Sequence, residues 1–67
     1  MIKNKLSEVM GKRRINMAAL ARRSGLSHVA IFKIYHAKTK TIEFDTINKL
    51  CNALNCRMQD LFEHIPD

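Results

Sequence analysis

The most distinctive chemistry in this sequence lies between positions 28 and 33, where an imidazole, an ammonium group and two large apolar side chains share one short stretch. If the stretch is a helix with Ile31 and Ile34 facing inward, four residues face outward. These are His28, Val29, Phe32 and Lys33. In a DNA major groove, apolar tips touch thymine methyl groups, and imidazole or ammonium groups reach guanine acceptors or phosphates. The apolar pair could instead be buried against a partner chain or the N-terminal segment, and residue types alone leave both interpretations open.

Cysteine and histidine are the other residues whose chemistry needs interpretation. A structural zinc site requires four ligands at close paired spacings, whereas this chain has only Cys51 and Cys56 with three scattered histidines. Cys51 falls on the apolar stripe of an expected helix, and cysteine packs as a small hydrophobe. We therefore predict buried structural thiols and no metal or cofactor. Two cysteines without a secretory context also favour a reducing compartment.

Catalytic machinery is not indicated by the sequence. Catalysis needs a nucleophile with a base, or paired carboxylates, in a pocket. The acidic residues are few, and the only glycines are Gly11 and Gly25, so no glycine-rich phosphate loop is present. We predict that the protein is not an enzyme.

Two short helices, at 17–24 and 28–35, are expected to position the face that begins at His28. Asn16 and Ser27 are good N-caps, because their side chains can accept from free N–H groups of the first turn. Gly25 can adopt the left-handed conformation that closes the first helix. Ala21 supplies the small side chain that a steep, close crossing of two short helices needs.

This pattern resembles the helix-turn-helix of the Cro and phage-repressor family of DNA-binding proteins. Six positions carry the resemblance through apolar residues, a small crossing residue and a turn glycine: Leu20, Ala21, Gly25, Leu26, Ile31 and Ile34. Ser24 departs from the pattern, since a larger apolar residue is commoner there. The resemblance implies one compact all-α domain of five helices over residues 1–67. It also implies a small transcriptional regulator, a repressor, that binds double-stranded DNA sequence-specifically.

The resemblance assigns site residues as well. Family base contacts fall at Ser27, His28, Val29, Phe32 and Lys33, where typical members carry Gln, Arg, Ser or Thr. Family phosphate contacts fall at Asn16, at the backbone of Met17 and in the following loop at His36, Lys38 and Lys40. Met17 replaces a common Gln, so one side-chain contact is lost. A helix N-terminus is a ready anion site because its N–H groups are free.

The charge is unevenly distributed along the chain. Residues 1–40 hold ten Lys and Arg against Glu8, a net charge of +9, whereas residues 41–67 hold two basic and five acidic residues, a net charge of −3. Such asymmetry is typical of a polyanion-binding protein, although a solvated basic surface that aids solubility would show the same excess. Arg22 and Arg23 are predicted to be solvated charges on the outer side of the 17–24 helix.

The rest of the chain predicts three more helices, at 5–14, 44–54 and 58–63, around a loop at 36–42. Residues 1–5 are expected to be frayed or extended, with Asn4 capping the first helix. The residue Ala37 stands where the family usually has Gly, so either it adopts the left-handed conformation at a cost of about 1–2 kcal/mol or the helix runs on by a turn. The predicted core consists of Leu6, Val9, Leu20, Ala21, Leu26, Ile31, Ile34, Ile47, Leu50, Cys51, Leu54 and Leu61.

Partners and location follow from the same observations. We expect a weak homodimer, since helix-turn-helix proteins commonly read paired half-sites and spare apolar surface is offered only by Met58, Phe62, Ile65 and the first residues. The alternative function is a protein-interaction module, such as an antitoxin-like or adaptor subunit. RNA binding is a weaker interpretation, because an aromatic stacking platform is absent. No apolar run or leader indicates membrane insertion or export, so we expect a cytoplasmic protein at the nucleoid.

Overall fold

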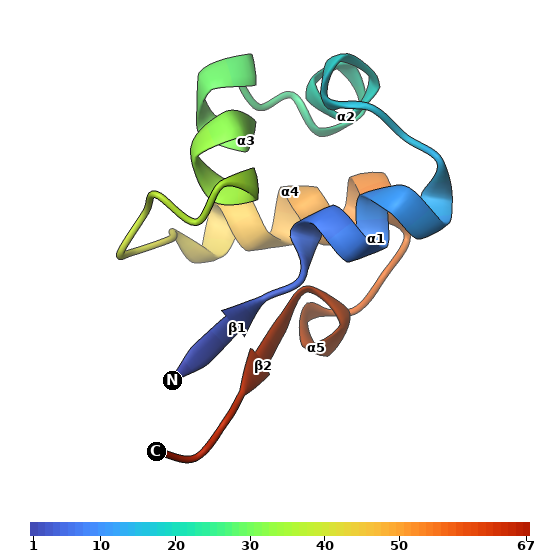
Figure 1. Cartoon of the computed structure of the whole chain (residues 1–67). Coiled ribbons are helices and arrows are strands. Elements are labelled where there is room, and N and C mark those ends of the chain that lie inside the picture. The colour runs from blue at the N-terminus through green and yellow to red at the C-terminus, as the bar shows by residue number, and fades with distance from the viewer.

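The computed structural model describes all 67 residues and contains five helices and two short strands. In chain order the elements are β1 (Ile2–Asn4), α1 (Leu6–Arg13), α2 (Met17–Ser24), α3 (His28–Tyr35), α4 (Phe44–Leu54), α5 (Met58–Leu61) and β2 (Phe62–His64). Figure 1 shows α1 and α4 across the centre, with α2 and α3 on one side and the strands and α5 on the other. No helix combines the length and apolar character needed to cross a membrane.

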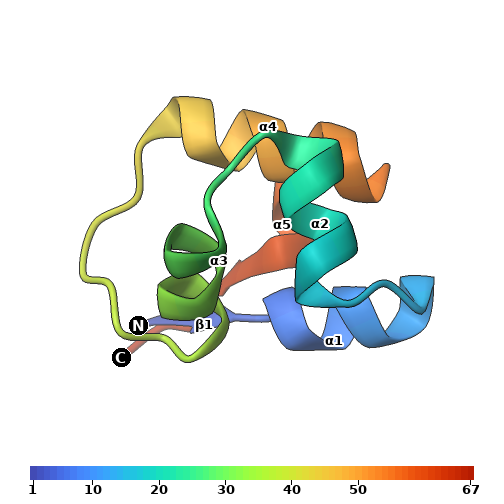
Figure 2. The same cartoon turned by 90° about the horizontal axis from the view of Figure 1, so that it is seen from above.

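The helix-turn-helix forms where the sequence predicts it. Asn16 Oδ1 accepts a hydrogen bond from Ala19 N at 2.8 Å, and Ser27 Oγ accepts one from Ala30 N at 3.1 Å, so each helix begins at a side-chain cap. Gly25 ends α2 in the left-handed conformation at φ 77°. Seen from above in Figure 2, α3 is end-on while α2 lies across the view, so the two helices cross steeply. The predicted bounds, caps and turn of this unit are confirmed.

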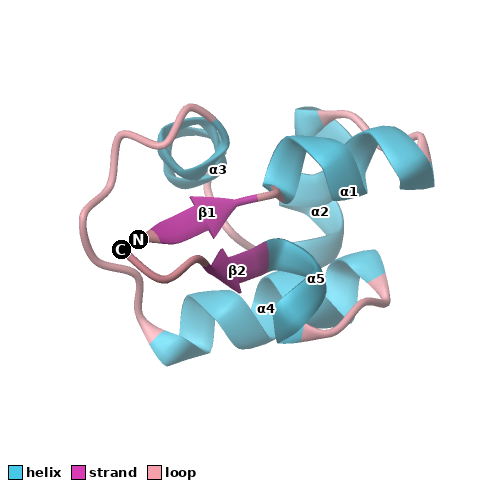
Figure 3. Ribbon diagram, turned by 60° about the horizontal axis from the view of Figure 1, so that its bottom comes forward, coloured by secondary structure: helices cyan, strands magenta, loops and turns pink.

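A small antiparallel sheet corrects the expectation of a strictly all-α fold. β1 pairs with β2 in the register Ile2 with His64, Lys3 with Glu63 and Asn4 with Phe62 (Figure 3). The pairing continues to the next residues, where Ile65 N donates to Met1 O at 2.8 Å. The protein is therefore mostly helical with a two-stranded sheet, and of the two alternatives for residues 1–5 the extended one is correct.

Of the three remaining helices, α4 has the predicted bounds, whereas α1 and α5 are shorter than predicted. The fifth helix was predicted over 58–63 but ends at Leu61, because Phe62 is extended at φ −135° and starts β2. α1 begins at Leu6 and ends at Arg13, so its N-cap is Lys5 and not Asn4 as predicted, and Lys5 makes no side-chain cap bond. Asn4 lies one residue further out, where its Oδ1 accepts from Leu6 N at 2.9 Å. α4 spans the predicted residues, and Asn55 ends it in the left-handed conformation at φ 50°.

Ala37 resolves the two alternatives for the end of α3. It lies at φ 53°, so the left-handed alternative is correct and the helix does not run on. Ala37 N donates to Ile34 O at 3.0 Å and Lys38 N donates to Lys33 O at 2.8 Å. These two bonds form a Schellman motif, which satisfies carbonyl groups that a helix end would otherwise leave free.

The core lies between the helices and contains ten buried side chains. They are Leu6, Val9, Met10, Ile15, Leu20, Ile31, Ile34, Leu50, Leu54 and Leu61. Three predicted core residues, Ala21, Leu26 and Cys51, are only half-buried and pack against this core. The prediction for Ile47 is wrong: it is half-buried and lines a groove that is open to solvent, because nothing in the chain covers that part of α4.

Candidate nucleic-acid interface

The outward face of α3 forms one continuous surface. His28, Val29, Phe32 and Lys33 line a shallow, open hollow of about 470 Å³ together with Lys38 from the following loop. Val29 is 62% exposed and Phe32 is 44% exposed, so neither is buried against the N-terminal segment. The opposite side of the same helix buries Ile31 and Ile34 in the core. Four of the five residues predicted for base contacts therefore share one solvent-facing side, as the helical spacing requires.

Phe32 is the centre of a small aromatic and cationic cluster. Its ring centroid lies 4.4 Å from that of His36 with the planes inclined by 53°, and Lys38 Nζ lies 5.4 Å from the same centroid. Tyr35 contacts His36 edge-on at 5.0 Å. A cation within about 6 Å of a ring face is attracted by its quadrupole. The Schellman turn at Ala37 makes the contact between Lys38 and Phe32 possible, because it folds the chain back and brings Lys38 beside α3.

The N-termini of α2 and α3 are capped in the same way. Ser27 is exposed, and its oxygen already accepts from Ala30 N. Asn16 is exposed in the same way and caps α2. The N–H groups of Met17 and Ala18 have no acceptor within the chain, so they are free to bind an anion. The side chain of Met17 packs against the core, so only its backbone is available there.

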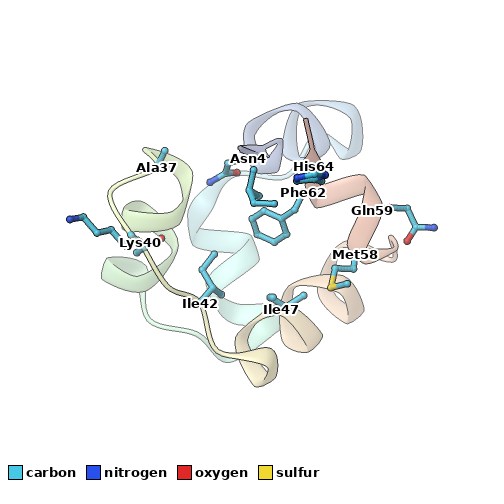
Figure 4. Close-up of a pocket in the computed structure, with 11 residues that line it drawn as sticks. Asn4, Ala37, Lys40, Ile42, Ile47, Met58, Gln59, Phe62 and His64 are labelled. Atoms are coloured by element: carbon cyan, nitrogen blue, oxygen red, sulfur yellow. The ribbon is translucent and has the colours of Figure 1, made fainter. Parts of the chain in front are cut away.

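The three residues predicted for phosphate contacts after α3 do not lie together in the structure. His36 is exposed and joins the cluster around Phe32, and Lys38 lines the hollow of α3. Lys40 does not line that hollow; it lies further along the loop, and its side chain extends outward from the chain (Figure 4). The structure thus brings His36 and Lys38 to the α3 face, whereas Lys40 stands apart.

Charge supports the same face. No acidic residue occurs between Glu8 and Glu43, a stretch that contains α2, α3 and the loop. The four ion pairs all lie outside this stretch: Met1 with Asp67, Lys3 with Glu8, Lys5 with Glu63, and Lys49 with Asp45. Every cation from Arg22 to Lys40 is therefore without an intramolecular carboxylate, as a surface for a polyanion requires. Arg22 and Arg23 are exposed, in agreement with the prediction of solvated charges.

The cysteines lie far along the chain from this face and form no metal site. Cys51 and Cys56 are free thiols that pack against the core, but both are half-buried, so the prediction of buried thiols is corrected to partial burial. Burial, and after it the neighbouring Cys51, raises the pKa of the Cys56 thiol to about 11. No group of three or more potential metal ligands occurs.

Two structural features of the site were not predicted. The first is the cluster around Phe32; the four-residue spacing of Phe32 and His36 on a helix was its available signal. The second is a bond from Asn4 Nδ2 to Ile34 O at 2.6 Å, which ties β1 to the last turn of α3. No local pattern reports this bond, because its partners are 30 residues apart.

Comparison with known proteins gives the same assignment. The family described as the Cro/C1-type HTH DNA-binding domain matches residues 5–67. The chain is also 27% identical over 59 residues to YozG of Bacillus subtilis (strain 168), described as an uncharacterized HTH-type transcriptional regulator; the match covers 88% of this chain and 70% of that protein. The family match spans nearly the whole chain and includes both helices of the unit described above. This protein belongs to the Cro/C1-type helix-turn-helix family of DNA-binding domains.

Proposed function

We propose that residues 1–67 act as a single DNA-binding domain of a transcriptional repressor, with α3 inserted in the major groove. The observation that carries the proposal is the exposed α3 face, where His28, Val29, Phe32 and Lys33 surround one hollow in a part of the chain without acidic residues. A major groove about 12 Å wide admits an α-helix, and base edges are read there by hydrogen bonds and methyl contacts. An enzymatic role is no part of this proposal.

Base reading is assigned to Ser27, His28, Val29, Phe32 and Lys33. Val29 and Phe32 offer apolar surface for thymine methyl groups, and the exposed imidazole of His28 and ammonium of Lys33 offer donors to guanine. Ser27 lies at the N-terminal end of the helix, where its hydroxyl can still donate a hydrogen bond. The apolar share of this face favours sites that contain A·T pairs.

Phosphate binding is assigned to Asn16, Met17, His36, Lys38 and Lys40. The free N–H groups at the start of α2 provide one backbone contact, with Met17 acting through its main chain only. Lys38 stands at the edge of the α3 hollow, where a phosphate beside the groove would lie. Such contacts fix the register of the protein on the duplex but carry no sequence information.

We further propose that two copies bind adjacent half-sites, since helix-turn-helix proteins commonly bind half-sites one helical turn apart. The alternative, a module that holds a protein partner through Val29 and Phe32, is not favoured by the family match. Nuclease treatment during purification distinguishes the two, because a stoichiometric protein partner that survives it, with no DNA retained, would contradict the DNA-binding proposal.

The direct test is selection of duplexes from random DNA, followed by fluorescence anisotropy with the selected and a scrambled duplex. His28→Ala and Phe32→Ala should each cost about 1–3 kcal/mol on the selected duplex and leave the scrambled one nearly unchanged. His64→Ala, on the exposed face of β2, is the matched histidine control and should change neither. No enrichment in the selection, or an unchanged ratio of the two affinities in both variants with the fold intact, would refute the assignment of α3.

A further inference from the structure

The side chain of Asn4 joins three separate parts of the chain. Asn4 lies in β1 opposite Phe62 of β2, so the sheet fixes its main chain. Its Nδ2 donates to Ile34 O in the last turn of α3 at 2.6 Å, and its Oδ1 accepts from Leu6 N at the start of α1 at 2.9 Å. One half-buried amide therefore holds the start of one helix and the end of another that lies 30 residues away.

The carbonyl group that Asn4 reaches also anchors the turn that follows α3. Ile34 O accepts from Ala37 N at 3.0 Å as part of the Schellman motif, so the two donors together satisfy both lone pairs of this oxygen. No other hydrogen bond joins α3 to a distant part of the chain. Apart from the bond from Asn4, α3 is held only by packing and by its covalent connections.

The turn held in this way presents groups of the proposed DNA-binding face. The ring of His36 lies 4.4 Å from that of Phe32, and Lys38 Nζ lies 5.4 Å from the Phe32 centroid. Asn4 does not line the hollow of α3. Its effect on that face is therefore indirect, through Ile34 O and the main chain that continues from it.

An amide side chain suits both partners of Asn4. Leu6 N is a donor and Ile34 O is an acceptor, so the group between them must accept and donate at once. Aspartate would only accept at neutral pH, and an ionised carboxylate would repel the carbonyl oxygen of Ile34. Serine can accept from Leu6 N, but its oxygen ends one bond short of the position of the amide nitrogen.

We infer that Asn4 is a positioning residue for DNA reading, which fixes the last turn of α3 and the turn after it without touching DNA. The inference rests on the proposed insertion of α3 into the major groove. Packing of Ile31 and Ile34 in the core is not directional, so it permits small rotations and shifts of the helix. A hydrogen bond requires a distance and an angle, and so do the contacts that read base edges. Release of the helix end should therefore cost specific binding more than non-specific binding.

Three substitutions of Asn4 test this by fluorescence anisotropy on the selected and the scrambled duplex. Asn4→Ser keeps the bond from Leu6 N and loses the bond to Ile34 O; Ser24 Oγ already accepts from Leu26 N at 3.1 Å across the same spacing. Asn4→Asp loses the same bond at neutral pH, and Asn4→Ala loses both. Each variant should weaken binding to the selected duplex by about 2- to 30-fold, the range for residues that act on a site without contacting its ligand, and change the scrambled duplex less.

Thermal melts separate positioning from a purely structural role. Asn4→Ala should melt at a lower temperature than Asn4→Ser, because it loses one bond more, but it should bind the selected duplex no more weakly. A structural role alone would make affinity follow the melting midpoint. Asn52 is exposed on α4 and makes no side-chain hydrogen bond, so Asn52→Ser is the matched control and should change neither quantity, while Asn52→Asp shows the effect of the added charge alone.

Amide hydrogen exchange without DNA follows the turn directly. In Asn4→Ser the N–H group of Ala37 should exchange about 2- to 10-fold faster, whereas that of Gly25, which closes α2 by the equivalent bond to Ala21 O, should not change. Unchanged exchange at Ala37, an unchanged affinity for the selected duplex in all three variants, or losses that follow the melting midpoints would overturn the inference. A wild-type chain that binds no duplex would refute the proposed function, and the exchange rates would still decide whether Asn4 holds the turn.

Discussion

Replacing Ala37 by glycine should stabilise the protein, although it removes a methyl group. Ala37 is exposed and lies at φ 53°, where a Cβ atom crowds the following carbonyl group and costs about 1–2 kcal/mol. Glycine is free of that penalty, but it loses about 0.5–1 kcal/mol more backbone entropy than alanine on folding. At the middle of each range the difference leaves a net stabilisation of about 0.75 kcal/mol, and both hydrogen bonds of the Schellman motif are main-chain bonds that glycine retains.

A thermal melt followed by circular dichroism measures this effect. For a domain of 60–100 residues, 1 kcal/mol shifts the midpoint by about 4–8 °C, so Ala37→Gly should raise it by about 2–8 °C. Ala18→Gly is the matched control, because Ala18 is exposed in the right-handed first turn of α2 and its replacement should lower the midpoint or leave it unchanged. An equal or lower midpoint for Ala37→Gly would refute the assignment of backbone strain to this turn.

Three further predictions concern charge, reactivity and packing. Lys38→Ala should weaken binding to all DNA sequences alike and reduce the slope of log affinity against log salt by about one, measured by anisotropy across a salt series; a sequence-selective loss would place Lys38 on a base instead. The pKa of Cys56 is raised, so the folded state favours its neutral thiol: that stabilisation is fully present below pH 9.0 and is lost as the pH rises toward about 11. Iodoacetamide at pH 9 should therefore label Cys56 more slowly in the native than in the urea-unfolded chain, and equal rates by mass spectrometry would contradict this. Ala21→Leu should destabilise the protein by about 1–3 kcal/mol or more through overpacking, and an unchanged melting midpoint would show that Ala21 is not at a tight crossing.

The helices that carry the site could be predicted because their signals are local. Asn16, Gly25 and Ser27 each act within a few residues, through a cap or a left-handed turn, so a single sequence suffices to place α2 and α3. The outward set on α3 follows from the inward positions of Ile31 and Ile34 by helical geometry alone. What the local pattern cannot provide is the arrangement of groups that meet only after the chain folds back.

The sheet illustrates that limit. β1 and β2 have three residues each and pair across about 60 residues of chain, and strands so short show no alternation that periodicity could detect. Ile47 shows a second limit, which concerns whether a helix face is covered. It fits the apolar period of α4 as well as Leu50 and Leu54 do, but the period reports only which residues share a face and not whether another element covers it. Position 47 faces the open groove, so a correct helical pattern yields a wrong core residue.

The bond between Asn4 and α3 links the missed sheet to the predicted site. Asn4 Oδ1 holds the start of α1, and its Nδ2 donates to Ile34 O in the last turn of α3, beside the Schellman turn that positions Lys38. Asn4 therefore connects the two-stranded sheet, the start of α1 and the end of α3.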